Sequence, residues 1–87
     1  MRILVVEDDS ILLDGLSVGL SLHCMAVDGV STCQDARVAL ATTTYNAIVL
    51  DIMLPDGSGI DVLRYLRRRN DPTPILLLAK LKAVIYL

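Results

Sequence analysis

The chain alternates short apolar runs with longer segments of mixed character. Apolar residues are nearly continuous at positions 2–6, 47–50 and 75–78. Continuous runs of this length are typical of strands that are buried on both faces of a parallel sheet. A weaker run at Met25–Asp28 predicts one more strand.

The segments between these runs have the apolar spacing of helices. They extend from residue 9 or 10 to about 22, from 31 or 32 to the threonines at 42–44, and from 57 to 69. In the first segment Leu12, Leu16 and Leu20 share one face, as an amphipathic helix requires. Gly15 and Gly19 weaken this helix or allow it to pack closely on the sheet. Alternation of strands and helices predicts an α/β fold with a parallel sheet and right-handed crossovers.

Two of the apolar runs end in acidic residues. The first is followed by Glu7, Asp8 and Asp9, and the run at 47–50 is followed by Asp51. In open α/β sheets ligands bind outside the carboxyl ends of the strands, where these acids would meet. Clustered carboxylates repel one another, and a divalent cation such as Mg²⁺ relieves that repulsion. The simpler interpretation, that the acids cap the next helix, suits Asp9 but does not account for Asp51.

Two motifs carry a resemblance to a known family. Residues 5–9 read Val-Val-Glu-Asp-Asp, and residues 49–59 read Val-Leu-Asp-Ile-Met-Leu-Pro-Asp-Gly-Ser-Gly. Together, on predicted strands, they resemble the receiver domain of two-component response regulators, closest to the subfamily with a winged-helix DNA-binding domain. The resemblance implies a flavodoxin-like sheet of strand order 2-1-3-4 with a fifth strand beyond. It covers residues 1–79 as a partial receiver domain and leaves 80–87 as a non-matching apolar tail.

The resemblance also implies roles for individual residues. Asp51 would be the phosphoacceptor, and a sensor histidine kinase would be the donor. Asp8 would bind Mg²⁺ directly, Asp51 would share the ion, and Glu7 would bind it mainly through water. Met53 would contribute its backbone carbonyl.

The chain departs from the family after the fourth predicted strand. In an alignment without a gap, Ala79 stands where the family has a Thr or Ser; with a one-residue gap, Ala79 and Lys80 match the family but the hydroxyl is missing. The family's lysine has no clear counterpart, although Lys80 and Lys82 lie near that edge. We therefore expect phosphorylation with impaired switching. The tail at Ala83–Leu87 predicts either a substitute edge strand or a local helix. An uncovered fourth strand, Ile75–Leu78, would favour pairing with another chain, so we expect a homodimer or a larger self-associated form.

Composition narrows the function further. The 87 residues are enough for one domain, and 54% of them are hydrophobic. A net charge of −2 gives no nucleic-acid footprint, so no direct nucleic-acid binding is expected. No apolar run approaches the roughly 20 residues of a membrane span, and the amino terminus lacks a signal peptide's basic lead. Cys24 and Cys33 match no metal or disulfide pattern. A cytoplasmic protein without a membrane partner is expected.

Other functions remain as alternatives. A haloacid-dehalogenase-like phosphatase would need a second Asp two residues after Asp51, where Met53 stands. A flavodoxin-type FMN site would need a Ser/Thr-rich phosphate loop after the first strand, and Glu7-Asp8-Asp9 stands there. We therefore expect no enzyme beyond a self-phosphorylating acceptor. A truncated receiver that acts only as a structural or self-association module, without phosphotransfer, stays open.

Overall fold

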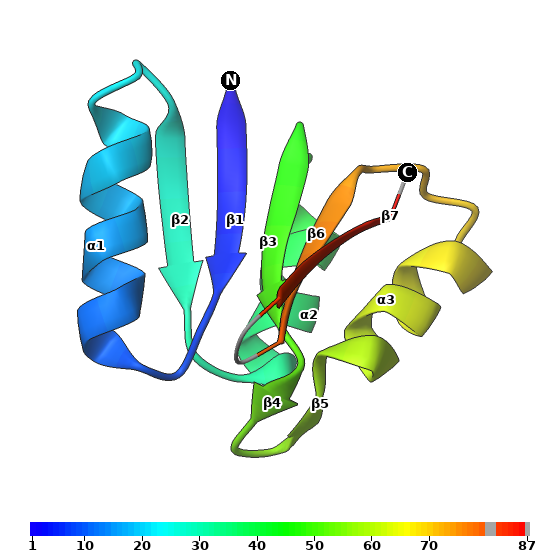
Figure 1. The fold of residues 1–87 in the computed structure, drawn as a ribbon. Helices are drawn as coiled ribbons and strands as arrows, with labels where there is room; N and C mark the ends of the chain where they lie inside the picture. Colours follow the sequence, from blue (N-terminus) through cyan, green and yellow to red (C-terminus); the bar gives the residue numbers. More distant parts are fainter. Residues whose placement is uncertain (80–81, 87) are drawn as a thin grey trace.

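The computed structural model describes residues 1–79 and the backbone of residues 82–86. One mixed sheet has the strand order β2-β1-β3-β6-β7, and a separate two-stranded hairpin follows β3 (Figure 1). In chain order the elements are β1 Arg2–Val6, α1 Ser10–Ser21, β2 Ala26–Val30, α2 Cys33–Thr42, β3 Ala47–Asp51, β4 Met53–Leu54, β5 Gly57–Ser58, α3 Gly59–Arg68, β6 Ile75–Ala79 and β7 Lys82–Tyr86. The predicted α/β fold and the order of its first four sheet strands are confirmed.

The tail forms the fifth strand of the sheet. Strand β7 pairs antiparallel with β6, with Ile75 opposite Tyr86 and Ala79 opposite Lys82. The prediction of a substitute edge strand is therefore confirmed for residues 82–86, the helical alternative is wrong there, and Leu87 lies outside the described residues. The expectation that β6 would be left at an open edge is also wrong, because the chain's own tail covers it.

One face of the sheet packs against α2 and α3. On this face, which we call the closed face, side chains of alternate strand positions pack against those on the inner sides of both helices. Its largest fully buried side chains include Leu4, Ile48, Leu50, Leu66, Ile75 and Leu77. Burial of this much apolar surface is the main stabilising contribution to the fold.

The opposite face, which we call the open face, is covered over β1 and β2 alone by the helices that the structure describes. Helix α1 packs there, with Leu13 against Gly29, but none of residues 10–21 is fully buried. The prediction that Leu12 faces the sheet is wrong. Leu12 is 44% exposed, because the helix turns Leu13 toward β2 instead. Close packing through Gly15 and Gly19 is also wrong, since a Cβ at either position would meet nothing within 4 Å.

Several predicted boundaries need correction. Strand β2 begins at Ala26 and continues to Val30, because its backbone pairs with the whole of β1. Helix α3 begins at Gly59 rather than at Gly57, because residues 53–58 form the β4–β5 hairpin. Side-chain caps mark the starts of α1 and α2: Asp9 accepts from two backbone amides, and Thr32 accepts from the Asp35 amide.

Candidate functional site

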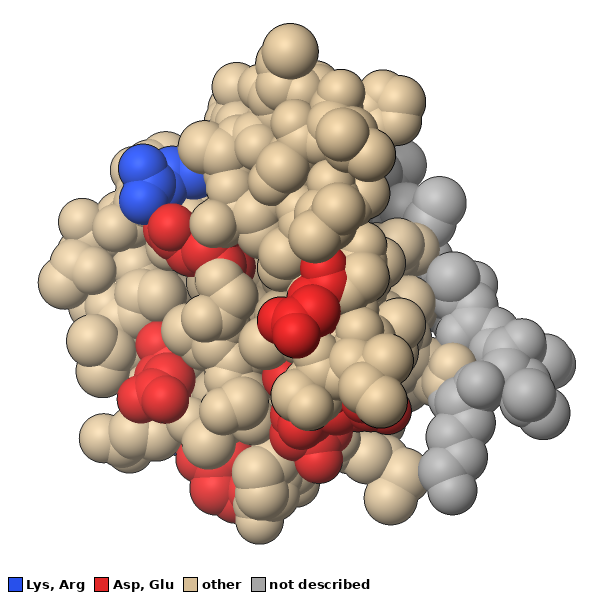
Figure 2. All heavy atoms as spheres, turned by 90° about the vertical axis from the view of Figure 1, so that its left-hand side faces the viewer, with Lys and Arg blue, Asp and Glu red and all other residues tan. Residues whose placement is uncertain are grey.

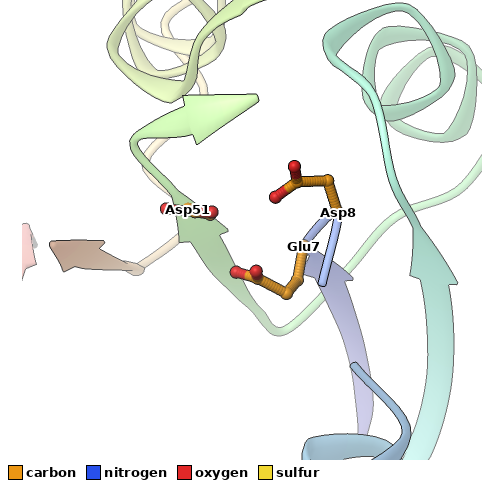
Figure 3. A group of neighbouring side chains, drawn as sticks. All are labelled: Glu7, Asp8 and Asp51. Atoms are coloured by element: carbon orange, nitrogen blue, oxygen red, sulfur yellow. The ribbon is translucent and has the colours of Figure 1, made fainter. Parts of the chain in front are cut away.

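Three acidic side chains meet at the carboxyl edge of the sheet. Strands β1 and β3 are parallel neighbours with Val6 opposite Leu50, so the residues that follow them emerge side by side. Ligand oxygens of Glu7, Asp8 and Asp51 all lie within 4.8 Å of one another. Figure 3 shows the three carboxylates directed into the same space between the two strand ends. The structure thus brings together the three acids that the sequence singled out.

The members of this cluster differ in exposure. Glu7 is 4% exposed, Asp51 is half-buried and Asp8 is exposed. Burial raises the pKa of Glu7 from 4.5 to about 7; the neighbouring carboxylates Asp51 and Asp8 add to the rise, and a hydrogen bond from the Asp9 amide at 3.1 Å opposes it. A proton on Glu7 therefore relieves part of the repulsion in this cluster.

Asp28, a half-buried carboxylate on the edge strand β2, has the basic partner that the cluster lacks. Asp28 accepts two hydrogen bonds from Arg2, both at 2.9 Å, and one from the Tyr45 hydroxyl at 2.6 Å. These partners lower the pKa of Asp28, the tyrosine most of all. Among the described side chains no lysine or arginine forms an ion pair with Glu7, Asp8 or Asp51. Their negative charge is therefore free to attract a cation.

The donor set fits Mg²⁺. Carboxylate oxygens are hard ligands, and Mg²⁺ is commonly held by one or two carboxylates while it keeps several waters. Glu7, Asp8 and Asp51 offer such oxygens from one compact cluster. The fourth nearby acid, Asp9, is engaged elsewhere, because its Oδ1 accepts from the Ile11 and Leu12 amides at the start of α1.

The loop after Asp51 is built around that residue. The Met53 amide donates to Asp51 Oδ1 at 3.2 Å, and the Met53 side chain is 64% exposed. The Gly59 amide donates to the Ile52 carbonyl at 2.8 Å, which closes the loop. A Cβ at Gly59 would lie 2.1 Å from the Asp51 carbonyl oxygen, so only glycine allows this approach. The hairpin thus fixes the backbone on both sides of Asp51.

Sequence analysis missed the anchor of this hairpin. Asp56, at its turn, accepts from the Cys33 amide at 2.8 Å and from the Gln34 amide at 3.0 Å, at the start of α2. The two segments are more than 20 positions apart in sequence, so no local pattern could have revealed the contact. An acidic residue followed by glycine in a turn was the only signal.

The far side of the site is formed by the end of β6. Leu78 pairs with Asp51, and Ala79, which follows it, is exposed and carries no hydroxyl. Lys82 lies opposite Ala79 in the strand register, so its backbone is near this edge of the sheet. Lys80 lies outside the described residues.

The surface around the site is mainly acidic. Figure 2 views the molecule from the α1 side, and acidic side chains gather in the lower half of that face, toward the carboxyl ends of the strands. Few basic side chains appear on this face, so it offers nucleic acid no basic patch. Among the described residues no helix has the length and apolar character needed to cross a bilayer.

Comparison with known proteins identifies relatives. A family model for the response regulator receiver domain matches residues 3–86. The response regulator protein PmrA of Pseudomonas aeruginosa is 47% identical over 78 residues, which are 90% of this chain and 35% of PmrA. The transcriptional regulatory protein BasR of Escherichia coli is 38% identical over the same length and 35% of its own chain is covered. The chain therefore spans about a third of the length of the curated relatives that it matches.

Solved structures agree with this assignment. The receiver domain of the Francisella response regulator 1452 superposes with a TM-score of 0.88 at 27% identity, covering 93% of this chain and 67% of that domain. The response regulator TrrA of Thermotoga maritima, solved in complex with Mg(2+)-BeF, superposes with a TM-score of 0.78 at 25% identity, covering 87% of this chain and 64% of TrrA. The fold and the sequence lead to the same family.

Proposed function

The chain belongs to the response regulator receiver family of two-component systems, and on that premise we propose that Asp51 accepts a phosphoryl group from the phosphohistidine of a sensor histidine kinase. One observation carries the proposal most directly: Asp51 ends a central strand within 4.8 Å of two further acidic side chains. A carboxylate nucleophile suits this chemistry because it forms an acyl phosphate that a later water can hydrolyse.

The transfer step is a simple displacement. An Asp51 carboxylate oxygen forms the new bond to phosphorus, the bond between phosphorus and the donor imidazole nitrogen breaks, and that nitrogen keeps the electron pair. Such transfers have a loose transition state with charge spread over the phosphoryl oxygens, so positioning and charge neutralisation supply most of the rate. The Met53 amide, which donates to Asp51 Oδ1, orients the nucleophile.

We assign the metal site to Asp8 and Asp51 as direct ligands, Glu7 mainly through water, and the Met53 carbonyl. The bound Mg²⁺ would neutralise the transferred group and the cluster itself. Two observations support this assignment: the compact set of hard oxygen donors, and a related receiver-fold regulator, TrrA, that is solved in complex with Mg(2+)-BeF.

We further propose that switching is impaired. Ala79 offers no hydroxyl to a phosphoryl group on Asp51, although it follows the residue that pairs with Asp51. Phosphorylation should then change amide resonances close to Asp51, including that of Leu78, which pairs with it, and leave those of the rest of β6 nearly unmoved. Widespread shifts along β6 would contradict this part of the proposal.

The division of the chain into a receiver at 1–79 and a tail at 80–87 stays a prediction.

Acetyl phosphate tests the acceptor without a kinase. We expect mass spectrometry after treatment with acetyl phosphate and Mg²⁺ to find one phosphate, on Asp51, and we expect Asp51→Asn to abolish it. Asp14→Asn, which removes a carboxylate on α1, is the matched control and should retain the label. Phosphate on another residue, or label retained in Asp51→Asn, would contradict the assignment.

A second candidate is self-association, with or without phosphotransfer. On the open face an apolar groove of about 340 Å³ lies beside α1, lined by Leu20, Val49 and Leu76 among others. The outer side of α1 is also apolar, with Ile11 and Val18 exposed. A helix ridge and a groove on the same face are self-complementary, as a two-fold dimer requires. We therefore propose that two copies pair through this face.

Sedimentation over a concentration series tests the dimer. Val18→Glu should shift the equilibrium toward monomer, because it places a charge on the outer side of α1. Val38→Glu is the matched control, since Val38 on α2 is 56% exposed against 61% for Val18. A monomer at every concentration would overturn the proposal, as would equal effects of the two substitutions.

A further inference from the structure

The β4–β5 hairpin has its base at the acidic cluster and its tip at another helix. Asp51 and Met53 lie at the base, and the turn at the tip contains Asp56. The carboxylate of Asp56 accepts hydrogen bonds from the backbone amides of Cys33 and Gln34, the first two residues of α2. The hairpin is therefore held at both ends.

The contact at the tip completes the cap of α2. The first amides of a helix have no partner within the helix, and its positive dipole end favours an anion. Thr32 supplies a hydroxyl to the Asp35 amide at 3.0 Å, and Asp56 supplies one carboxylate oxygen each to the Cys33 and Gln34 amides. The two hydrogen bonds from these amides lower the pKa of Asp56, and the one from Cys33 has the larger effect.

Leu54, next to the turn, is 9% exposed and packs in the apolar core, whereas the turn itself is held by polar contacts. Pro55 and Asp56 make the turn and are exposed, and Gly57 has a φ of +154°, a conformation that other residues rarely adopt. Cys33 adds one weak contact, with its Sγ donating to the Ser58 carbonyl at 3.6 Å. Among the described residues, the two hydrogen bonds that Asp56 accepts are therefore the short polar contacts that join the turn to α2.

We propose that Asp56 is a positioning residue for phosphotransfer: by tying the hairpin tip to α2, its carboxylate holds the Met53 backbone in place beside Asp51. This inference rests on the proposed function of Asp51 and adds a residue that touches neither the phosphoryl group nor the metal. Its effect passes through the hairpin backbone, which is two residues long on each side of the turn.

Three variants separate positioning from general stability. Asp56→Ala removes both amide contacts, Asp56→Asn keeps one acceptor oxygen, and Thr32→Ala weakens the same helix start without touching the hairpin. For each variant the rate of Asp51 phosphorylation by acetyl phosphate is measured against Mg²⁺ concentration, and stability is measured by urea unfolding. Residues that orient metal ligands typically change metal affinity by about 10-fold or more.

We expect Asp56→Ala to raise the Mg²⁺ concentration at half-maximal rate by about 10-fold, Asp56→Asn to restore part of that loss, and Thr32→Ala to leave it unchanged at similar stability. Equal Mg²⁺ dependence in Asp56→Ala and Thr32→Ala would overturn the inference, and so would an Asp56→Asn variant with no recovery. A wild-type chain that is not phosphorylated at all would instead overturn the proposed function, so the two failures are distinguishable.

Discussion

The two faces of the central sheet use the same strands but are covered very differently. On the closed face, Leu50 and Leu77 are sealed under α2 and α3 with at most 2% exposure. On the open face, the neighbouring positions Val49 and Leu76 are half-buried and line a groove beside α1. Adjacent residues of one strand therefore have quite different surroundings.

This difference shows which part of the molecule supports the site. Strand β3, which presents Asp51, is buried mainly on the closed face, and the hairpin anchor on α2 belongs to that side as well. Strand β1, which presents Glu7, is buried on both faces. Over β3 and β6 the open face is only half-buried. It is apolar surface available for contact with another molecule.

The largest expected effect separates the two faces directly. Leu77→Ala should lower the free energy of unfolding by about 2–5 kcal/mol, because it leaves a cavity in a sealed core. Leu76→Ala, one residue away on β6, should lower it by only about 1 kcal/mol, because its side chain is already partly in water. Urea unfolding followed by circular dichroism measures both. Equal losses would show that the open face is also sealed in solution.

Much of the fold could be predicted because its strands are locally unmistakable. The runs at 3–6 and 47–50 are apolar at every position, as a strand buried on both faces requires, and they appear in β1 and β3. The exposure of α1 could not be predicted, since its leucine spacing suits a covered helix. Whether the tail forms a strand depends on pairing with β6, which no local pattern contains.

Two glycines extend the contrast to backbone packing. Gly59→Ala should cost about 1–3 kcal/mol, as overpacking does, because its Cβ would meet the Asp51 carbonyl oxygen. Gly19→Ala, in the exposed helix α1, should stabilise the chain by up to about 1 kcal/mol, because alanine favours helix and nothing lies within 4 Å. Thermal unfolding of both variants is the measurement. A stabilising Gly59→Ala would contradict the close approach at Asp51.

The acidic cluster should make stability depend on pH in the absence of metal. The pKa of Glu7 in the folded chain is about 7, above its ordinary 4.5, so folding favours the protonated form. That contribution is fully present below pH 4.5 and is lost as pH rises through 7. Between pH 8 and pH 6 the wild type should therefore gain stability relative to Glu7→Gln. Chemical denaturation in a chelating buffer measures the difference, and an identical pH dependence in both proteins would refute it.

The site was predictable in part for similar reasons. Glu7, Asp8 and Asp51 follow strands whose parallel pairing brings them to one edge, so their meeting could be predicted from sequence order. The contact from Asp56 to α2 could not, because it joins segments that approach each other only after the helix packs on the sheet. Likewise, the hairpin at residues 53–58 resembles a loop that leads straight into a helix.

The most direct test of the central claim is the Mg²⁺ dependence of phosphate incorporation at Asp51. The initial rate of labelling by acetyl phosphate is measured by mass spectrometry against Mg²⁺ concentration, for the wild type and for Asp8→Ala. We expect a saturable Mg²⁺ dependence in the wild type and its loss in Asp8→Ala, with both chains folded by circular dichroism. Labelling of Asp51 that proceeds equally without Mg²⁺, or that is unchanged in Asp8→Ala, would contradict the assignment of this acidic edge.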